Sequence, residues 1–185
     1  IMNNATFFFN QPKNEPVLSY AKGSKERELL SKELEKQYNQ CIEIPIIING
    51  KEIKTGNVSE VVMPTEHSHV LAKFHKADKE TVQKAIESAL EARKKWENVH
   101  WIDRCSIMLR AAELLAGKYR YVINAATMLG QGKNPFQAEI DSACETIDFL
   151  RFNVHYASKI YAQQPLSDNS AINRLEYRGL EGFVY

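Results

Sequence analysis

The sequence has little of what several classes of protein require. Lys and Arg number 24 against 23 Asp and Glu, so a net charge of +1 lacks the basic excess that a nucleic-acid binder needs. The most apolar runs, such as Ile44–Ile48, are far shorter than the roughly 20 residues that span a bilayer. We therefore expect no nucleic-acid partner and no membrane insertion.

Cysteine is also scarce. The three cysteines, Cys41, Cys105 and Cys144, are widely spaced and form no C-x-x-C motif, which predicts no disulfide framework and no zinc ribbon. This usage is typical of reduced thiols in an intracellular compartment. The first residues lack the basic region of a secretory signal and the arginines of a transit peptide, and we expect residues 1–14 to be a disordered tail.

What is present indicates a globular protein. Hydrophobic residues make up 44% and charged residues 25% of the 185, which is ordinary for a chain that buries a core. The sequence stops within an apolar strand candidate, Gly182–Tyr185, whereas complete domains usually end in frayed polar residues. We expect residues 15–185 to be the front part of a longer protein.

The first half of the sequence mixes one helix with short strands. Ser24 is a plausible N-cap for a surface helix over 25–38. Asn49-Gly50 between two β-prone runs in 45–53 predicts a hairpin. Strands are also expected at 58–63 and 70–74, separated by the polar stretch 64–69.

Apolar spacing predicts helices for about eighty residues after Asp78, which is the expected cap of the first. Gly117 and Gly130 are expected to end the second and third helices, and Pro135 to begin a long fourth one. The expected ranges are 79–96, 103–116, 119–130 and from 135 onward, followed by strands at 174–178 and 182–185. The fold class is α/β.

Three constellations invite a chemical reading. Gly130–Lys133 resembles a phosphate loop, but its spacing is not that of a Walker A motif and a helix C-cap with a linker fits better. His67, His69 and His75 lie close in sequence, yet polar turn residues are a simpler interpretation than a metal site, and we expect no metal. Cys105 and Cys144 fall within helical patterns and are expected to be inert thiols.

The long fourth helix carries Glu139, Asp141, Glu145 and Asp148. Glu145 is bordered by Cys144, Ile147 and Phe149, so it could point into a partly apolar cleft, where a carboxylate often has a function. The alternative is a solvated acidic face, which the spacing alone favours. Both interpretations stay open at this point.

Several segments resemble the opening of an aldehyde dehydrogenase: the INGKEI hairpin, the helix ending in Trp96 and the helix that follows it. Longer strings resemble one branch of that superfamily, the mitochondrial-type Δ1-pyrroline-5-carboxylate dehydrogenases. These strings are NEPVLSYAKGSKER (14–27), GQGKN (130–134), QAEIDSACETIDFLRFN (137–153) and YRGLEGFV (177–184).

The resemblance implies an NAD-dependent enzyme that oxidises glutamate γ-semialdehyde to glutamate in proline breakdown. In the family a cysteine thiolate, an oxyanion hole, a Glu base and nearly all cofactor contacts follow YRGLEGFV, so it implies no catalytic, cofactor-binding or metal residue in this chain. It implies a substrate-site role for Glu145, with Phe149 as its neighbour one turn on. The expected fold is the aldehyde-dehydrogenase-like N-terminal portion: a hairpin and short strands packed with an antiparallel helical cluster, with most of the Rossmann-type sheet missing.

Further expectations follow from the resemblance. The whole enzyme is expected to take a small aldehyde substrate, to form a homodimer or higher homo-oligomer and to lie in the mitochondrial matrix, whereas this chain alone is expected to be inactive. A different hypothesis is a self-contained helical protein-interaction module that uses the charged helix over 25–38. A phosphate-binding enzyme at Gly130–Lys133 is disfavoured by its spacing.

Overall fold

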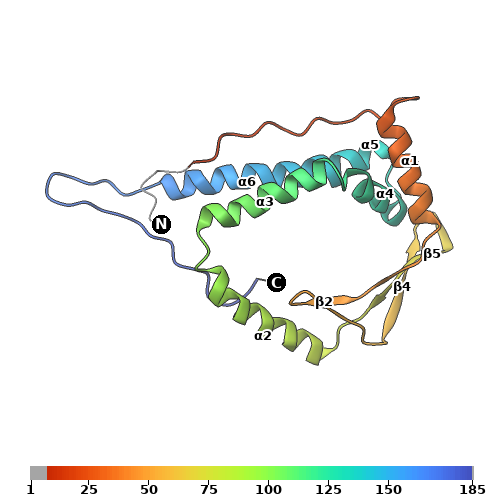
Figure 1. Cartoon of the computed structure of the whole chain (residues 1–185), viewed down its shortest axis with the longest axis horizontal. Coiled ribbons are helices and arrows are strands. Elements are labelled where there is room, and N and C mark those ends of the chain that lie inside the picture. The colour runs from red at the N-terminus through yellow and green to blue at the C-terminus, as the bar shows by residue number, and fades with distance from the viewer. Residues whose placement is uncertain (1–7, 185) are drawn as a thin grey trace.

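The computed structural model describes residues 8–184, and Figure 1 shows helices and two small sheets arranged as a broad open ring. This is the α/β class that the sequence predicts. The elements in order are α1 (Lys25–Tyr38), β1 (Ile42–Ile44), β2 (Ile46–Ile48), β3 (Lys51–Ile53), β4 (Val58–Met63), β5 (Glu66–His75), α2 (Lys79–Trp96), α3 (Trp101–Ala116), α4 (Arg120–Gln131), α5 (Pro135–Ala138), the π-helix η1 (Glu139–Cys144) and α6 (Glu145–Ala162).

Helices α1 and α2 begin at the expected caps, whereas α3 begins at Trp101, two residues before its predicted start. The Ser24 side chain accepts a hydrogen bond from the Arg27 amide, and Asp78 accepts one of 2.8 Å from the Thr81 amide. Pro135 is the first residue of α5, as predicted, and a reciprocal capping box between Asn134 and Gln137 encloses it. The third predicted helix runs past Gly130 to Gln131, because the residue with the left-handed backbone of a C-cap is Gly132 (φ +69°).

The strands differ more from the prediction. The β2–β3 hairpin forms at Asn49-Gly50, which both have positive φ as a tight two-residue turn requires. The unpredicted β1 pairs in parallel with β5, which is the central strand of the order β1-β5-β4. β5 begins at Glu66 rather than at Val70, because the turn from β4 needs only Pro64 and Thr65.

Two apolar clusters hold the helices together. One joins α1, α4 and the preceding chain through Tyr20, Leu30 and Ala125. The other joins α3 to η1 and α6 through Ala112, Ala143 and Ile147, all fully buried. In Figure 1 α3 and α6 lie side by side and run in opposite directions, which is the expected antiparallel helical cluster. No helix within residues 8–184 is long and apolar enough to cross a membrane.

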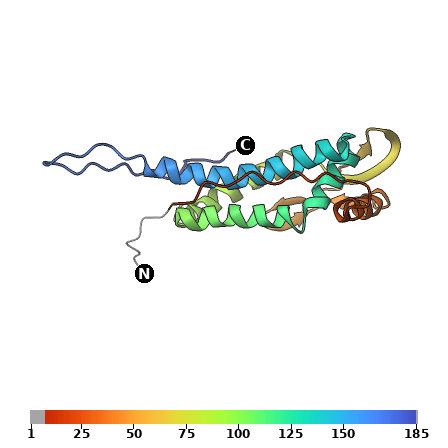
Figure 2. The same cartoon turned by 90° about the horizontal axis from the view of Figure 1, so that it is seen from above.

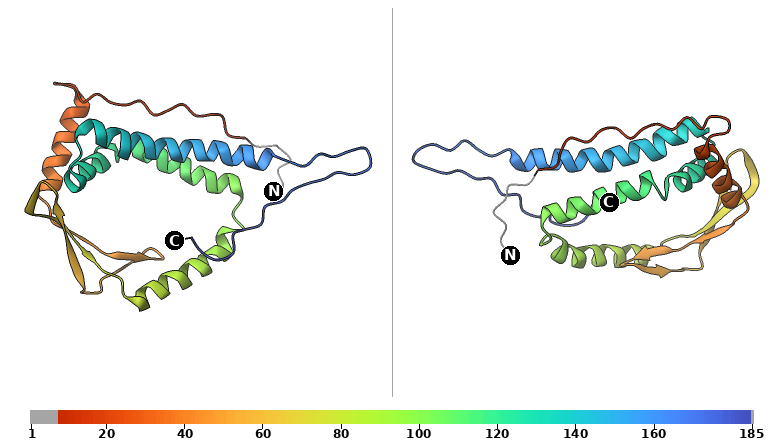
Figure 3. Two further views of the ribbon diagram at one scale, coloured as in Figure 1. Left: turned by 180° about the vertical axis from the view of Figure 1, so that it is seen from behind. Right: turned by 45° about the horizontal axis from the view of Figure 1, so that its top comes forward.

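Residues 8–18, called here the N-terminal strap, run in extended form along α6, as Figures 1 and 3 show. The carbonyl of Phe9 lies 2.8 Å from Nδ1 of His155, and the Phe9 ring meets Trp101 edge-on at 5.8 Å. The predicted disorder of residues 1–14 is therefore wrong for residues 8–14, because specific hydrogen bonds and aromatic contacts hold them. Residues 1–7 lie outside the described part of the chain.

The expected strands at 174–178 and 182–185 do not form within the described residues. After α6 the chain extends away from the body and returns to lie beside α2, as Figures 1 and 2 show. Arg93 of α2 donates a 3.0 Å hydrogen bond to the carbonyl of Leu180. A strand needs a neighbouring strand to pair its backbone groups, and residues 163–184 have none among the described strands.

Helix α2 buries only Thr81, while its apolar residues Val82, Leu90 and Trp96 stay 39–49% exposed. Isolated from any longer protein, the chain should therefore self-associate or bind hydrophobic dyes, since apolar area of this kind stabilises contacts that remove it from water. Sedimentation and dye fluorescence check this. A sharp monomer boundary with cooperative melting and no dye binding would contradict it.

Candidate functional site

The two residues predicted to contact substrate lie on one exposed face of α6. Glu145 begins this helix and Phe149 follows one turn later with 58% of its surface exposed. Both line a pocket of about 580 Å³, called here the α6 pocket. Its lining comes from the strap (Asn14, Glu15, Val17), from η1 (Ile140, Cys144) and from α6 (Glu145, Asp148, Phe149, Phe152, Asn153, Tyr156).

Glu145 differs from the other acids of the α6 pocket. Within the described residues its carboxylate has no hydrogen bond or ion pair, whereas Glu15 is paired with two arginines. The two oxygens of Asp148 accept hydrogen bonds of 2.7 Å from Asn14 Nδ2 and from the Glu15 amide. Glu145 is thus the carboxylate with free capacity to bind a cationic group, beside the apolar surface of Phe149.

The acidic residues of this helix do not form one solvated face. Glu139 is fully buried and accepts hydrogen bonds from Arg120, from Tyr20 Oη at 2.6 Å and from Asn124 Nδ2 at 2.8 Å. The amide of Leu18 donates a further bond at 2.9 Å. The solvated interpretation is therefore wrong for Glu139, because a buried arginine and three polar donors compensate for its lost hydration.

Arg120 is the other half of this buried network. Besides Glu139, its guanidinium donates to Glu15 Oε1 at 2.5 Å and to the carbonyl of Pro16 at 2.7 Å. The second oxygen of Glu15 lies 2.5 Å from Arg151 of α6. The network thus ties α4, η1, α6 and the strap together at one place.

The charges of the network favour each other's ionised forms. Burial alone would raise the pKa of Glu139, but hydrogen bonds from Arg120 and Tyr20 lower it below its ordinary value. Burial likewise works against the charge of Arg120, yet the bonds to Glu139 and Glu15 raise its pKa. Tyr20 has a left-handed backbone (φ +52°). Burial, and then its hydrogen bond to Glu139, raise the pKa of the Tyr20 phenol, so the hydroxyl stays protonated and donates to Glu139.

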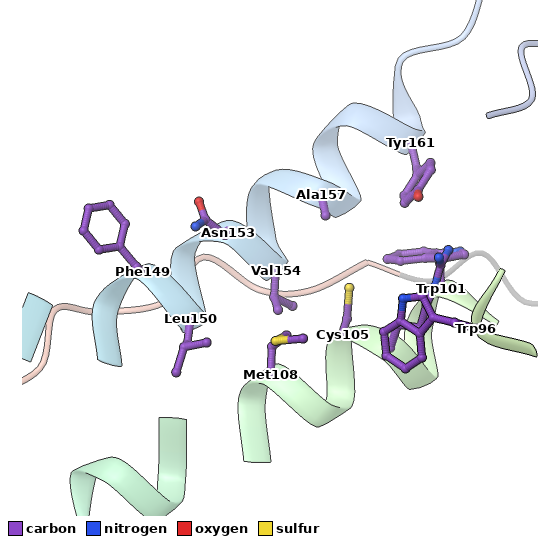
Figure 4. Close-up of a pocket in the computed structure, with 11 residues that line it drawn as sticks. Trp96, Trp101, Cys105, Met108, Phe149, Leu150, Asn153, Val154, Ala157 and Tyr161 are labelled. Carbon is purple, nitrogen blue, oxygen red and sulfur yellow. The ribbon is translucent and has the colours of Figure 1, made fainter. Parts of the chain in front are cut away.

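Neither helical cysteine is activated as a nucleophile. Burial, and then the charge of Glu139, raise the pKa of Cys144 to about 11, so its thiol is protonated at neutral pH. Burial also raises the pKa of Cys105. Cys105 lies in a second pocket of about 410 Å³ between α3 and α6, where Figure 4 shows its sulfur among Met108, Val154 and Trp101. Cys41 is exposed.

The remaining motifs have structural roles. Gly132 caps α4, as in the helix C-cap interpretation of Gly130–Lys133, and Lys133 pairs with Asp141 at 2.7 Å. His75 Nε2 lies 2.8 Å from Glu43, and His69 stacks on Tyr38. Among residues 8–184 no group of His, Cys, Asp or Glu is arranged to hold a metal ion, and no glycine-rich loop between a strand and a helix fits a dinucleotide.

The sequence predicts substrate contact for Glu145 and Phe149, and it did not point to the residues that build the pocket's other wall and its support. A signal for Arg120 and Asn124 was present, because two polar residues four apart interrupt the apolar stripe of α4. No local signal marks Asn14 and Glu15, whose partner Asp148 lies more than 130 residues away.

The matched sequence and the architecture define the class of protein. The profile of the aldehyde dehydrogenase family matches residues 52–184, and the chain belongs to this family. Its architecture is the N-terminal portion of that fold, as predicted, with a small partial sheet and several helices.

Within the family, the chain is similar to delta-1-pyrroline-5-carboxylate dehydrogenases. It is 50% identical to the one from Agaricus bisporus over 97% of this chain and 33% of that relative. It is 48% identical to the human mitochondrial one over 92% of this chain and 30% of the relative. The crystal structure of the Mycobacterium tuberculosis enzyme, also solved with NAD, superimposes with a TM-score of 0.95 at 42% identity, covering 98% of this chain and 34% of that one.

The chain therefore spans about a third of the length of the relatives it matches. The likeness extends over nearly the whole chain, which favours the enzyme family over a self-contained interaction module.

Proposed function

We propose that this chain forms the N-terminal third of an NAD-dependent dehydrogenase that oxidises L-glutamate γ-semialdehyde to glutamate. The observation that carries the proposal is the likeness to delta-1-pyrroline-5-carboxylate dehydrogenases, at 42% identity and a TM-score of 0.95 over 98% of the chain. Residues 15–185 would then be the N-terminal part of the cofactor-binding domain.

In this enzyme Glu145 and Phe149 are proposed to contact the substrate. Glutamate γ-semialdehyde carries an ammonium group, and the free carboxylate of Glu145 suits that charge. Phe149 offers an apolar face for the methylene chain of the substrate. Their part is to bind and orient the aldehyde, not to react with it.

The oxidation itself is assigned to residues outside this chain. Two of its thiols, Cys105 and Cys144, have raised pKa values, which supports a nucleophile elsewhere. Among residues 8–184 no glycine-rich loop joins a strand to a helix, which supports NAD contacts elsewhere in the complete enzyme. We further propose a homodimer or higher homo-oligomer in the mitochondrial matrix; the names of several relatives include the word mitochondrial.

The isolated 185-residue chain should neither bind NAD⁺ nor form NADH, because the proposed function places the nucleophile and nearly all cofactor contacts beyond it. Calorimetric titration with NAD⁺ and an absorbance assay with glutamate γ-semialdehyde check this. The complete enzyme is the control and should reduce NAD⁺ in the same assay. Micromolar NAD⁺ binding by the isolated chain would overturn this division of roles, and an inactive complete enzyme would overturn the proposed function.

A further inference from the structure

Asp148 joins the strap to the substrate-binding face of α6. Its two carboxylate oxygens accept one hydrogen bond each, at 2.7 Å, from Asn14 Nδ2 and from the amide of Glu15. The carboxylate of the next strap residue, Glu15, forms ion pairs with Arg120 and Arg151. The strap is thus fixed at residues 14 and 15, and Asp148 is the point where it meets the exposed side of the helix.

This contact determines the shape of the α6 pocket. Asp148 lies between Glu145 and Phe149 in sequence and lines the same pocket, but the strap occupies both of its oxygens. Asn14, Glu15 and Val17 form the pocket wall that faces these helix residues. Without the carboxylate of Asp148, the Asn14 side chain and the Glu15 amide would lose their hydrogen-bond acceptor, and this part of the strap would no longer be held against α6.

We propose that Asp148 is a positioning residue for the substrate: it holds the strap as a wall of the α6 pocket and so fixes where the amino-acid end of the aldehyde binds. This inference rests on the proposed function. Asp148 acts through hydrogen bonds to the strap and not through its charge on the substrate. It therefore contributes to the selection of an amino-acid aldehyde over a plain one.

Two substitutions in the complete enzyme separate hydrogen bonding from charge. Asp148→Ala removes both acceptors. Asp148→Asn removes the charge but keeps the contact, because its oxygen accepts from the Glu15 amide while its NH₂ donates to Asn14 once the Asn14 amide turns over. Asp141→Ala is the matched control, since Asp141 lies about two turns earlier, in η1, and pairs only with the surface residue Lys133.

KM and kcat are measured with glutamate γ-semialdehyde and with propionaldehyde, which lacks both the amino and the carboxylate group. Asp148→Ala should raise KM for the semialdehyde about tenfold with little change in kcat, and should leave kcat/KM for propionaldehyde and KM for NAD⁺ as in the wild type. Asp148→Asn and Asp141→Ala should both stay near the wild type.

Three outcomes overturn the inference. If Asp148→Ala has the wild-type KM for glutamate γ-semialdehyde, the contact between Asp148 and the strap does not affect substrate binding. Equal losses for both aldehydes show a general structural role. An Asp148→Asn enzyme as impaired as Asp148→Ala shows that the charge acts directly. A wild-type enzyme inactive on the semialdehyde would overturn the proposed function itself, whereas an active enzyme impaired by Glu145→Ala but not by Asp148→Ala would overturn this inference alone.

Discussion

Replacing Glu145 by alanine in the complete enzyme is expected to lower kcat/KM for glutamate γ-semialdehyde by roughly ten- to a hundredfold. The reason is the loss of one charge-assisted contact with the substrate ammonium, which typically costs about 1.5–3 kcal/mol. KM for NAD⁺ should barely change, because the proposed function assigns Glu145 to the aldehyde and not to the cofactor. Steady-state kinetics with each substrate varied in turn measure both effects.

The control for Glu145→Ala must be an acid that lies outside the pocket. Glu139 is unsuitable although it is only six residues away, because it is fully buried and its loss would disturb the fold. Asp141 is suitable, with a 44% exposed side chain in a surface ion pair. Equal kinetics for Glu145→Ala, Asp141→Ala and the wild type would favour the solvated-face interpretation and remove Glu145 from the substrate site.

Glu139→Ala is expected to lower the free energy of unfolding by about 3–5 kcal/mol, the usual cost of removing one partner of a buried ion pair. The substitution leaves Arg120 with only Glu15 as a charged partner and takes acceptors from Tyr20, Asn124 and Leu18. Thermal or denaturant unfolding of the variant and of the wild type measures the loss.

Glu145→Ala serves as the control for stability. Because the Glu145 carboxylate has no partner among residues 8–184, this variant should unfold like the wild type. Acid provides a second check on Glu139. Because its pKa is lowered in the folded state, its contribution is present above the ordinary value of 4.5 and is lost as the pH falls through the lowered one. A Glu139→Ala protein as stable as the wild type at neutral pH would refute the role of the network.

The elements that sequence predicted well are those fixed by neighbouring residues. The caps Ser24 and Asp78 and the helix start at Pro135 act within one helical turn, and Asn49-Gly50 determines the hairpin within four residues. The apolar spacing of α3 and α4 likewise reflects packing that repeats every turn. In each case the residues that determine the feature lie within a few positions of it in the sequence.

The elements that sequence missed depend on distant partners. The three residues of β1 gain their hydrogen bonds from β5, about thirty positions later, and a run that short has no recognisable alternation. The predicted strands after residue 173 failed for the opposite reason, since β propensity without a partner strand yields an extended loop.

The candidate site shows the same division. The residues around Glu145, together with the family resemblance, predict a substrate-site role for Glu145 and Phe149. Glu139 looked equally solvated by spacing, because its partner Arg120 belongs to another helix and its donors Tyr20 and Leu18 come from residues near the start of the chain. Helical periodicity predicts which residues share a face of the helix, but it does not predict which residues from other segments contact that face.

The π-helical turn at Glu139–Cys144 has a consequence for how these two carboxylates can evolve. The amide of Glu145 donates to the carbonyl of Ile140, five residues back, so the helix carries one residue more than an α-helical turn would. Losing that extra residue would rotate everything before it by about 100° relative to everything after it. Glu139 could then stay buried or Glu145 could stay exposed, but not both, so we expect the deletion of one residue in this stretch to disturb the protein more than point substitutions at its exposed positions.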